Sequence, residues 1–407
     1  MSDENAQKPL VTYDFCALCA VSLLCLCNLA IFYGFYNYLV FLDIPHAWRG
    51  PLLALEPLTA LALRPYLVTR LTLRNSIPAM RLGTGLAVLA LASYPFATSV
   101  PTIALVRVVH GAGYAILASG LMTAFSYFVS PKRVAQGYGI LSLTTLLPSA
   151  LMPPFVEIAT PLLPGPGWAY AMAAPLMLIV LLLLAPMGAK ARAMAADLPP
   201  EHSVRPGWGQ VLSGLRLPGV LGLVVGQFFM VTGHTIVYFF MKSWGLDLGV
   251  ANPGLFFAYA NLATIAVRVL GMRQLDRLNP GKTSGLALLF LAGLTPCFAL
   301  APAFGSGGEA ALLGMAVLYG VALGLCMPLL NAAMYRVSTD GPRASNMNLL
   351  LLAMDAGFIM GPIIGGWGLG AGLGLPSLFV TCGGLMLFAG LCVLPMARLT
   401  PATAKIR

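Results

Sequence analysis

Charged residues are scarce in this chain. Only 9% of its 407 residues are Asp, Glu, Lys or Arg, whereas a soluble globular protein has about 25%. Hydrophobic residues make up 59% of the chain. These proportions exclude an ordinary soluble protein. They indicate a protein that lies largely within a lipid bilayer, because apolar runs of about 20 residues, the length that one spanning helix needs, recur along the sequence.

Acidic residues are the scarcer of the two kinds of charge, with 13 against 23 basic residues and a net charge of +10. An excess of this size would suit a nucleic-acid partner if the basic residues were clustered in a soluble domain. Here they lie mostly in the short segments between apolar runs, where basic residues mark the cytoplasmic side of a membrane. We therefore expect no nucleic-acid partner.

The signatures of enzymes and cofactor sites are also missing. The eight cysteines all lie in apolar stretches, and they form neither a metal-ligand pattern nor an extracellular disulfide framework. The segment around Gly281-Lys282-Thr283 resembles the end of a phosphate-binding loop, but that loop needs a glycine five residues earlier, where this chain has Asp276. We predict that the protein is not an enzyme and uses no metal or cofactor.

The apolar runs predict an all-α polytopic membrane protein with twelve transmembrane helices. Six fall at about 15–41, 48–69, 78–99, 101–128, 134–160 and 168–188. Six more follow at about 217–243, 253–273, 282–303, 309–334, 344–371 and 375–396. The longest polar segment separates the two sets. We therefore predict an N-terminal six-helix bundle (1–188), a cytoplasmic linker (189–216) and a C-terminal six-helix bundle (217–407).

The distribution of Lys and Arg supports this map. With the N-terminus inside, 18 of the 23 basic residues lie in cytoplasmic segments, and only Arg49 and Lys242 lie on the opposite side. The other three, Arg64, Arg107 and Arg268, fall within helices. Such an asymmetry sets the orientation of membrane proteins. Both termini are therefore predicted to be cytoplasmic, which requires an even number of helices.

Short matches between the two halves indicate an internal repeat. An offset of 204 residues places Arg64 on Arg268 and Asn75 on Asn279. Duplicated helical bundles are typical of secondary transporters, in which the substrate site lies between the repeats near the middle of the membrane.

Three short motifs stand out on this helix map. They are the loop Gly271–Lys282, the fourth-helix segment Arg107–Gly113 and the eleventh-helix segment Gly361–Gly366. The loop has a glycine, an Asp-Arg pair, a second glycine and a basic residue, and the fourth helix reads Arg-x-x-His-Gly-x-Gly. In these features the chain resembles the major facilitator superfamily. The resemblance implies a secondary transporter that works by alternating access and binds a small-molecule substrate.

The resemblance to particular branches is uneven. Thr72 stands where the first-half loop should carry an aspartate, and the fifth helix has prolines at Pro148 and Pro153 in place of the antiporter motif of the drug/proton antiport branch. Arg64-Pro65 and Arg268 resemble bacterial efflux permeases of the sugar-efflux kind. This likeness implies a location in the bacterial inner (plasma) membrane.

Charged residues inside the first half point to a coupling site. Glu56 and Arg107 lie at similar depths from the same side of the membrane, which makes an ion pair between them possible. Two interpretations stay open: a proton-coupled or anion-binding site, and a structural pair that holds the bundle together. His110 belongs to the same motif as Arg107 and is expected to pack beside Gly111.

Polar residues in the second half form a second candidate set. Asp355 lies midway along the eleventh helix, and burial would favour its neutral form enough to let it exchange a proton in each cycle. In the alternative interpretation it caps or pairs with a neighbouring helix. Gln227, His234 and Tyr238 share one face of the seventh helix. With Asn331 in the tenth helix, they are predicted to line a cavity, or alternatively to bond between helices.

Tyrosines crowd one end of the first helix, an arrangement that usually marks a belt at the membrane interface. In the alternative interpretation, Tyr33 and Asn37 are one turn apart and face the transport pathway. Glu157, near the end of the fifth helix, is expected to be a solvated residue at the rim.

The loop and glycine motifs predict a gate. The Asp276-Arg277 element would bind the end of a neighbouring helix in one conformation and release it in the other, and glycines permit close helix contact. The predicted gate comprises Arg64, Arg268, Gly271, Asp276, Arg277, Gly361 and Pro362.

We expect a monomeric, proton-coupled exporter of small organic molecules, with protons and the lipid bilayer as its other partners. An alternative is a proton-coupled importer of organic anions, because Arg107 and Arg268 can each hold a carboxylate. An intramembrane enzyme or a receptor is the more remote possibility.

Overall fold

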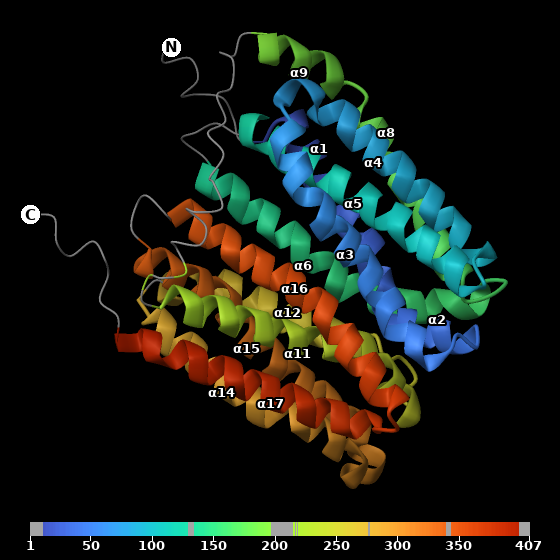
Figure 1. Cartoon of the computed structure of the whole chain (residues 1–407), viewed down its shortest axis with the longest axis vertical. Helices are drawn as coiled ribbons and strands as arrows, with labels where there is room; N and C mark the ends of the chain where they lie inside the picture. The colour runs from blue at the N-terminus through green and yellow to red at the C-terminus, as the bar shows by residue number, and fades with distance from the viewer. Residues whose placement is uncertain are drawn as a thin grey trace, which may run out of the picture. The chain divides into compact units, whose positions relative to one another are not determined.

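The structure is a computed structural model that describes residues 11–128, 134–196, 215, 217, 219–275, 277–338 and 343–398. These residues form helices and connecting turns, with no strand among them. Figure 1 shows the helices and their order. In a bilayer this is expected, because a helix satisfies all of its backbone hydrogen bonds within one segment.

The described residues of the first half form nine α-helices and several short 3₁₀ segments. The helices are α1 (Tyr13–Ala30), α2 (Phe35–Phe41), α3 (His46–Arg70), α4 (Leu73–Ser93), α5 (Val100–Phe128), α6 (Val134–Ala159), α7 (Trp168–Ala171), α8 (Ala173–Leu184) and α9 (Met187–Ala196). The 3₁₀ segments are η2 (Ile31–Gly34), η3 (Tyr94–Phe96) and η5 (Thr160–Leu162).

The second half has the same helical character. Its α-helices are α11 (Val220–Asp247), α12 (Leu255–Leu270), α13 (Met272–Leu275), α14 (Pro280–Cys297), α15 (Gly308–Val337), α16 (Arg343–Gly370) and α17 (Leu375–Val393). Two 3₁₀ segments, η6 (Phe298–Gly307) and η7 (Leu394–Arg398), follow α14 and α17.

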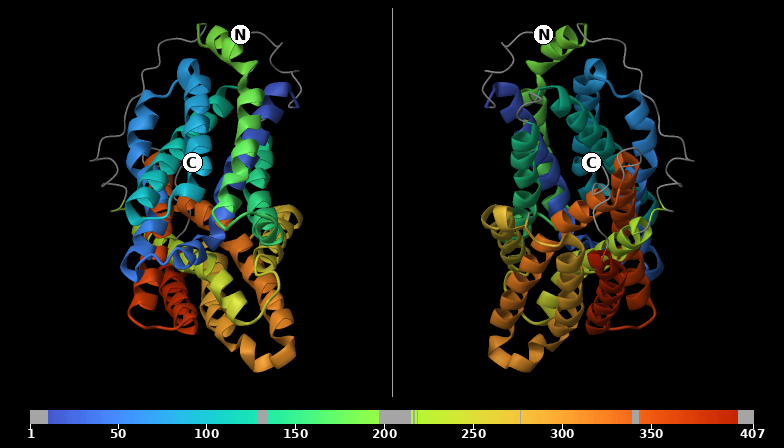
Figure 2. Two further views of the ribbon diagram at one scale, coloured as in Figure 1. Left: turned by 90° about the vertical axis from the view of Figure 1, so that its right-hand side faces the viewer. Right: turned by 90° about the vertical axis from the view of Figure 1, so that its left-hand side faces the viewer.

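Eight of the described helices are long and apolar enough to cross a membrane, or nine if the bent pair Trp168–Leu184 and Met187–Ala196 is one span. One of the eight, Pro280–Val337, has 58 residues. At about 1.5 Å per residue it would be about 87 Å long, far more than the hydrocarbon thickness of about 30 Å. It breaks at η6, where Gly305 has a φ of 54°, and Figure 2 shows the chain reversing there. It therefore makes two crossings.

Two further helices complete the map. α12 is apolar but has only 16 residues, and α3 has 25 residues but carries Arg49, Glu56 and Arg64. With these two helices and the division of Pro280–Val337, the structure is consistent with the expected twelve crossings.

The chain divides into two compact units. Unit 1 comprises Met1–Tyr33, Phe41–Ile44 and Leu55–Ser203, and unit 2 comprises Gly34–Val40, Pro45–Ala54 and Val204–Arg407. The first span therefore changes unit at η2, and α3 changes unit after its first turns. Most of the predicted linker lies outside the described residues, so its boundaries stay a prediction.

Unit 1 depends on close helix contacts at glycines. A Cβ atom on Gly83 of α4 would lie 2.6 Å from the backbone nitrogen of Leu117 in α5, and one on Gly113 would lie 2.8 Å from that of Ala87. Contacts this short admit no side chain, so α4 and α5 pack backbone to backbone. Figure 1 shows the two helices side by side.

The asparagines of the internal repeat hold the starts of two helices. At the start of α4, Asn75 accepts a hydrogen bond from the backbone N–H of Thr72 at 2.7 Å and donates one to the carbonyl of Arg70 at 2.8 Å. At the start of α14, Asn279 accepts from the backbone N–H of Lys282 at 3.0 Å. Since the offset of 204 residues pairs Asn75 with Asn279, the two halves place equivalent residues at equivalent helix starts.

Unit 2 contains a backbone contact between α3 and α16. A Cβ on Gly366 would lie 2.7 Å from the Cα of Gly50, and one on Gly50 would lie 2.8 Å from the carbonyl oxygen of Pro362. Nearby, Ser243 of α11 donates a hydrogen bond to the side-chain oxygen of Asn37 at 3.3 Å. The first turns of α3 are therefore held against α16 by a contact that only glycine permits.

This contact makes a prediction for stability. Gly366→Leu should force α3 from α16, because overpacking a tight contact costs about 1–3 kcal/mol. The apparent melting temperature of the purified protein should then fall by several degrees. The matched control is Gly293→Leu, since a Cβ at Gly293 meets nothing within 4 Å. Equal melting temperatures for the two variants would show that the contact is not tight.

Candidate functional site

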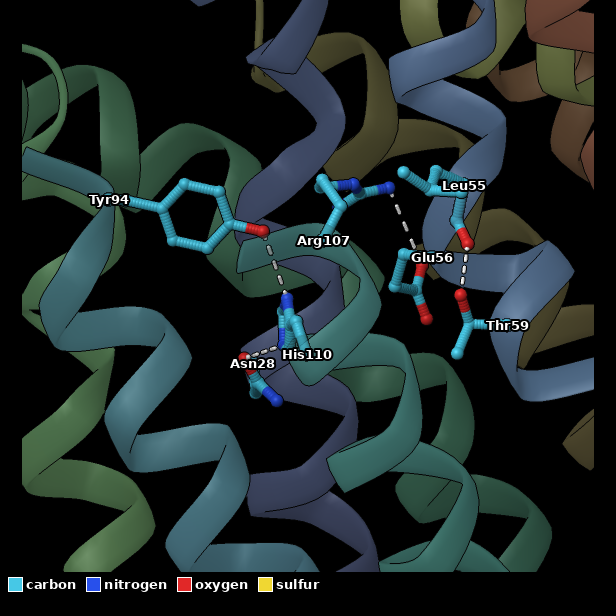
Figure 3. Close-up of polar contacts among 7 residues, drawn as sticks. All are labelled: Asn28, Leu55, Glu56, Thr59, Tyr94, Arg107 and His110. Atoms are coloured by element: carbon cyan, nitrogen blue, oxygen red, sulfur yellow. Dashed lines mark hydrogen bonds and ion pairs between the residues drawn. The ribbon is translucent and has the colours of Figure 1, made fainter. Parts of the chain in front are cut away.

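A buried ion pair occupies the centre of unit 1. Nη2 of Arg107, on α5, lies 3.6 Å from Oε2 of Glu56, on α3, and the two side chains are only 2% and 12% exposed (Figure 3). The helices approach closely because a Cβ on Gly111 would lie 2.5 Å from the carbonyl oxygen of Glu56. The pair that the sequence makes possible is therefore present.

His110 lies one turn along α5 from Arg107 and joins two other segments. Its Nε2 is 3.0 Å from Oδ1 of Asn28, on α1, and its Nδ1 is 3.2 Å from the hydroxyl of Tyr94, on η3. The exposed fractions of Asn28, His110 and Tyr94 are 1%, 0% and 0%. Figure 3 shows the three side chains in line. His110 was expected only to pack beside Gly111, and instead it bridges two helical segments.

Aromatic rings surround these polar groups. Phe32, on η2, lies with its ring centroid 5.4 Å from Cζ of Arg107 and 5.1 Å from the ring of His110. It also stacks on Tyr170, with the ring centroids 4.4 Å apart. A ring face attracts a guanidinium electrostatically, so Phe32 stabilises the Arg107 charge where water is excluded.

Sequence reasoning did not single out Asn28, Phe32, Tyr94 or Tyr170. A polar Asn28 in the middle of an apolar run was a usable signal, because such residues are rare within membrane helices. The aromatic residues gave no signal, since their types are common in any apolar helix.

The tyrosines of the first span are buried and do not form an interface belt. The exposed fractions of Tyr33, Tyr36 and Tyr38 are 0%, 6% and 4%. The hydroxyl of Tyr33 donates a hydrogen bond to the carboxylate of Glu157, on α6. The expected belt is therefore wrong. Glu157 is half-buried near the end of α6, so its rim position stays a prediction.

Unit 2 holds a neutral polar contact. Nδ1 of His234, on α11, lies 2.9 Å from the hydroxyl of Tyr319, on α15, and the two rings are nearly parallel. The amide of Gln227 donates to the sulfur of Met327 at 3.6 Å. Both contacts join α11 to α15, as the interpretation of bonding between helices predicts. Tyr319 was not identified from the sequence.

The other candidates in unit 2 are dispersed. Tyr238 is half-buried and packs edge-on against Phe257, whereas Asn331 is exposed. Asp355 is half-buried on α16. Within the described residues, no three His, Cys, Asp or Glu side chains lie together as a metal site would require.

The predicted gate residues have mixed environments. Gly361 and Pro362 are buried, Arg64, Arg268 and Gly271 are half-buried, and Arg277 is exposed. Asp276 lies outside the described residues. A Cβ on Gly361 would lie 2.6 Å from the carbonyl oxygen of Thr232, so α16 packs closely on α11 there.

Many apolar spanning helices, with charged and polar groups paired in their interior, define the chain as a polytopic membrane protein. The sequence profile of the Major Facilitator Superfamily matches residues 18–345, which is most of the chain. The chain therefore belongs to the Major Facilitator Superfamily. It is an integral membrane protein that carries small molecules by secondary transport, and it is not an enzyme.

Solved structures share this fold. A mutant of the nucleoside transporter NupG is similar with a TM-score of 0.76 and 13% identity, over 94% of this chain and 99% of that one. The unmutated NupG has a TM-score of 0.70 and 14% identity, over 95% of this chain and 100% of that one. A mutant of the peptide transporter POT, in complex with sulfate, has a TM-score of 0.72 and 16% identity, over 98% of each chain. No curated protein matches at significant sequence similarity.

The buried pair makes a second stability prediction. Glu56→Gln should leave the Arg107 charge buried and uncompensated, which costs on the order of 3–5 kcal/mol. The purified variant should melt at a clearly lower temperature. The double variant Glu56→Gln/Arg107→Met should recover part of the loss, because no buried charge is then left.

A matched control is the ion pair between Asp14 and Lys190, whose lysine side chain is 56% exposed. The Asp14 carboxylate that Lys190→Gln leaves behind is only 9% exposed, but it lies in the first turn of α1, where the helix dipole still stabilises a negative charge. Lys190→Gln should therefore lower the free energy of unfolding by less than Glu56→Gln does. If Glu56→Gln and Lys190→Gln lower the free energy of unfolding equally, burial does not strengthen the Glu56–Arg107 pair.

Proposed function

We propose that this protein is a proton-coupled exporter of a small organic molecule that works by alternating access. The observation that carries the proposal is the buried pair of Glu56 and Arg107. We further propose that it acts as a monomer in a bacterial inner membrane, with both termini in the cytoplasm, because 18 of its 23 basic residues lie in segments expected on that side.

A buried pair of this kind responds strongly to one proton. While Glu56 is ionised, it compensates the charge of Arg107 in a site that excludes water. Protonation of Glu56 removes that compensation and leaves a bare guanidinium, which is unfavourable at low dielectric. The protein then gains free energy by changing conformation or by bringing another group to Arg107. Proton entry is thereby coupled to a second event, as secondary transport requires.

Outward transport is proposed from the sequence resemblance. The placement of Arg64-Pro65 and of Arg268 resembles bacterial efflux permeases of the sugar-efflux kind. The structural neighbours carry a nucleoside and a peptide according to their names. We propose a polar organic solute of comparable size.

A second candidate function follows from the charge of Arg107. Once Glu56 is neutral, an anion that pairs with Arg107 compensates its positive charge again. A proton and an anion would then cross the membrane together. This favours a proton-coupled importer of organic anions. The two candidates share the coupling site and differ in the substrate's charge and direction.

The residues proposed for the substrate and proton pathway come from both units. They are Tyr33, Asn37, Glu56, Arg107, His110, Gln227, His234, Tyr238, Asn331 and Asp355. The gate is proposed to comprise Arg64, Arg268, Gly271, Asp276, Arg277, Gly361 and Pro362. Asp355 is the candidate coupling acid of unit 2, and Glu56 that of unit 1.

The test is flux in proteoliposomes with an imposed pH gradient, across a panel of labelled small molecules. Export is supported if a substrate moves against the inward flow of protons, and anion import if both enter together. We expect Glu56→Gln to abolish gradient-driven flux but to spare counterflow exchange, because exchange needs no net proton movement. Asp355→Asn is the matched variant in unit 2 and tests the second candidate acid: it should lose driven flux and keep counterflow only if Asp355 carries the proton.

The outcomes separate the candidate acids. If Asp355→Asn loses driven flux and keeps counterflow, whereas Glu56→Gln keeps both, then Asp355 is the coupling acid and the role proposed for Glu56 is wrong. If neither gradient-driven flux nor counterflow occurs with any molecule of a broad panel, the proposed function is wrong.

A further inference from the structure

The amide nitrogen of Asn28 is a buried donor that nothing in its surroundings satisfies. Asn28 is 1% exposed, and its Nδ2 has no hydrogen-bond partner among the described residues. In the described part of unit 1, it is the only buried side-chain nitrogen or oxygen in this condition. An unmet buried donor lowers stability, so its presence in a folded protein calls for an explanation.

The other end of Asn28 is firmly held. Its Oδ1 is 3.0 Å from Nε2 of His110, and Nδ1 of His110 is fixed by the hydroxyl of Tyr94 at 3.2 Å. If Tyr94 donates to Nδ1, then Nε2 carries the proton and donates to Asn28. This arrangement holds the amide plane in one orientation and directs the N–H₂ group away from the imidazole ring, as Figure 3 shows.

The free amide group belongs to the same buried cluster as the charged pair. His110 and Arg107 are one turn apart on α5, and so lie on one face of it. The ring of Phe32 lies against both of them, at 5.1 Å from His110 and 5.4 Å from Cζ of Arg107. Phe32 follows Asn28 by four residues on the first span. Asn28 is therefore linked to Arg107 through His110 and through Phe32 of the same span.

We infer that Asn28 is a specificity-determining residue whose Nδ2 donates a hydrogen bond to an acceptor oxygen, a carboxylate or carbonyl oxygen, of the transported molecule. The inference rests on the proposed function, since it takes the surroundings of Arg107 as the transport site. A buried donor that is satisfied only by the ligand discriminates strongly against molecules that lack the matching acceptor. The charge of Arg107 and the neutral donor of Asn28 together suit a carboxylic acid or an amide.

The test compares Asn28→Asp and Asn28→Leu with the wild-type protein. Aspartate keeps the oxygen that accepts from His110 but replaces the donor, and leucine has a similar volume with no polar atom. The matched control is Asn261→Asp in α12, where the amide donates to the carbonyl of Phe257 in its own helix. The probes are carboxylates, amides and amines that share the same carbon skeletons, from acetate to naphthoate.

Binding is read from the melting temperature of the purified protein, because a ligand of the folded state raises it. Carboxylates or amides should raise the melting temperature of the wild type and of Asn261→Asp, and the matched amines should not. The melting temperature of both Asn28 variants should not respond to these ligands. In flux assays the Asn28→Asp and Asn28→Leu substitutions should raise KM at least tenfold and change kcat less, as expected for lost recognition.

Three results would overturn the inference. In the first, carboxylates raise the melting temperature of an Asn28 variant as much as that of the wild type, although the variant melts normally without ligand. In the second, the matched amines raise the melting temperature of the wild type as much as the carboxylates do. In the third, no carboxylate or amide raises it. Failure of the proposed function gives a different pattern, since the wild type would then show no proton-driven flux. Driven flux with an unchanged KM in Asn28→Asp would refute the inference alone.

Discussion

The rest of unit 1 depends on a charge that is kept out of water. Arg107 is almost fully buried in a helix that crosses the membrane, and its charge is tolerated only because Glu56 and the face of Phe32 lie against it. This requires α3 to approach α5 closely, which Gly111 permits. The same arrangement makes the site responsive, since adding one proton to Glu56 removes the compensation on which the burial depends.

The break in the first span is the second structural requirement. A continuous helix from Tyr13 to Phe41 would place its side chains at regular intervals around one axis. The 3₁₀ segment η2 interrupts that regularity and sets Phe32 and Tyr33 towards two neighbouring helices, α5 and α6. Stretches of 3₁₀ helix within longer helices often mark functional sites. Here the break also coincides with the passage of the chain from unit 1 to unit 2.

The two units hold their polar groups differently, although the sequence repeats. In unit 1 the buried cluster is charged and contains a donor that its neighbours leave unmet. In unit 2 the contact between His234 and Tyr319 is a hydrogen bond between two side chains, and it supports the packing of α11 on α15.

The sequence by itself determined the membrane environment and the positions of the spans to within a few residues, and it identified Glu56 and Arg107 as possible partners. These follow from local hydropathy and from the cost of burying a charge, which limits its possible partners to the few other charges at similar depth. Only the tertiary structure decided that Asn28 and Tyr94 bind His110, and that Tyr33 meets Glu157. Neutral polar and aromatic groups have many possible partners along an apolar helix. The choice among them depends on how each helix rotates and bends, which residue spacing alone does not specify.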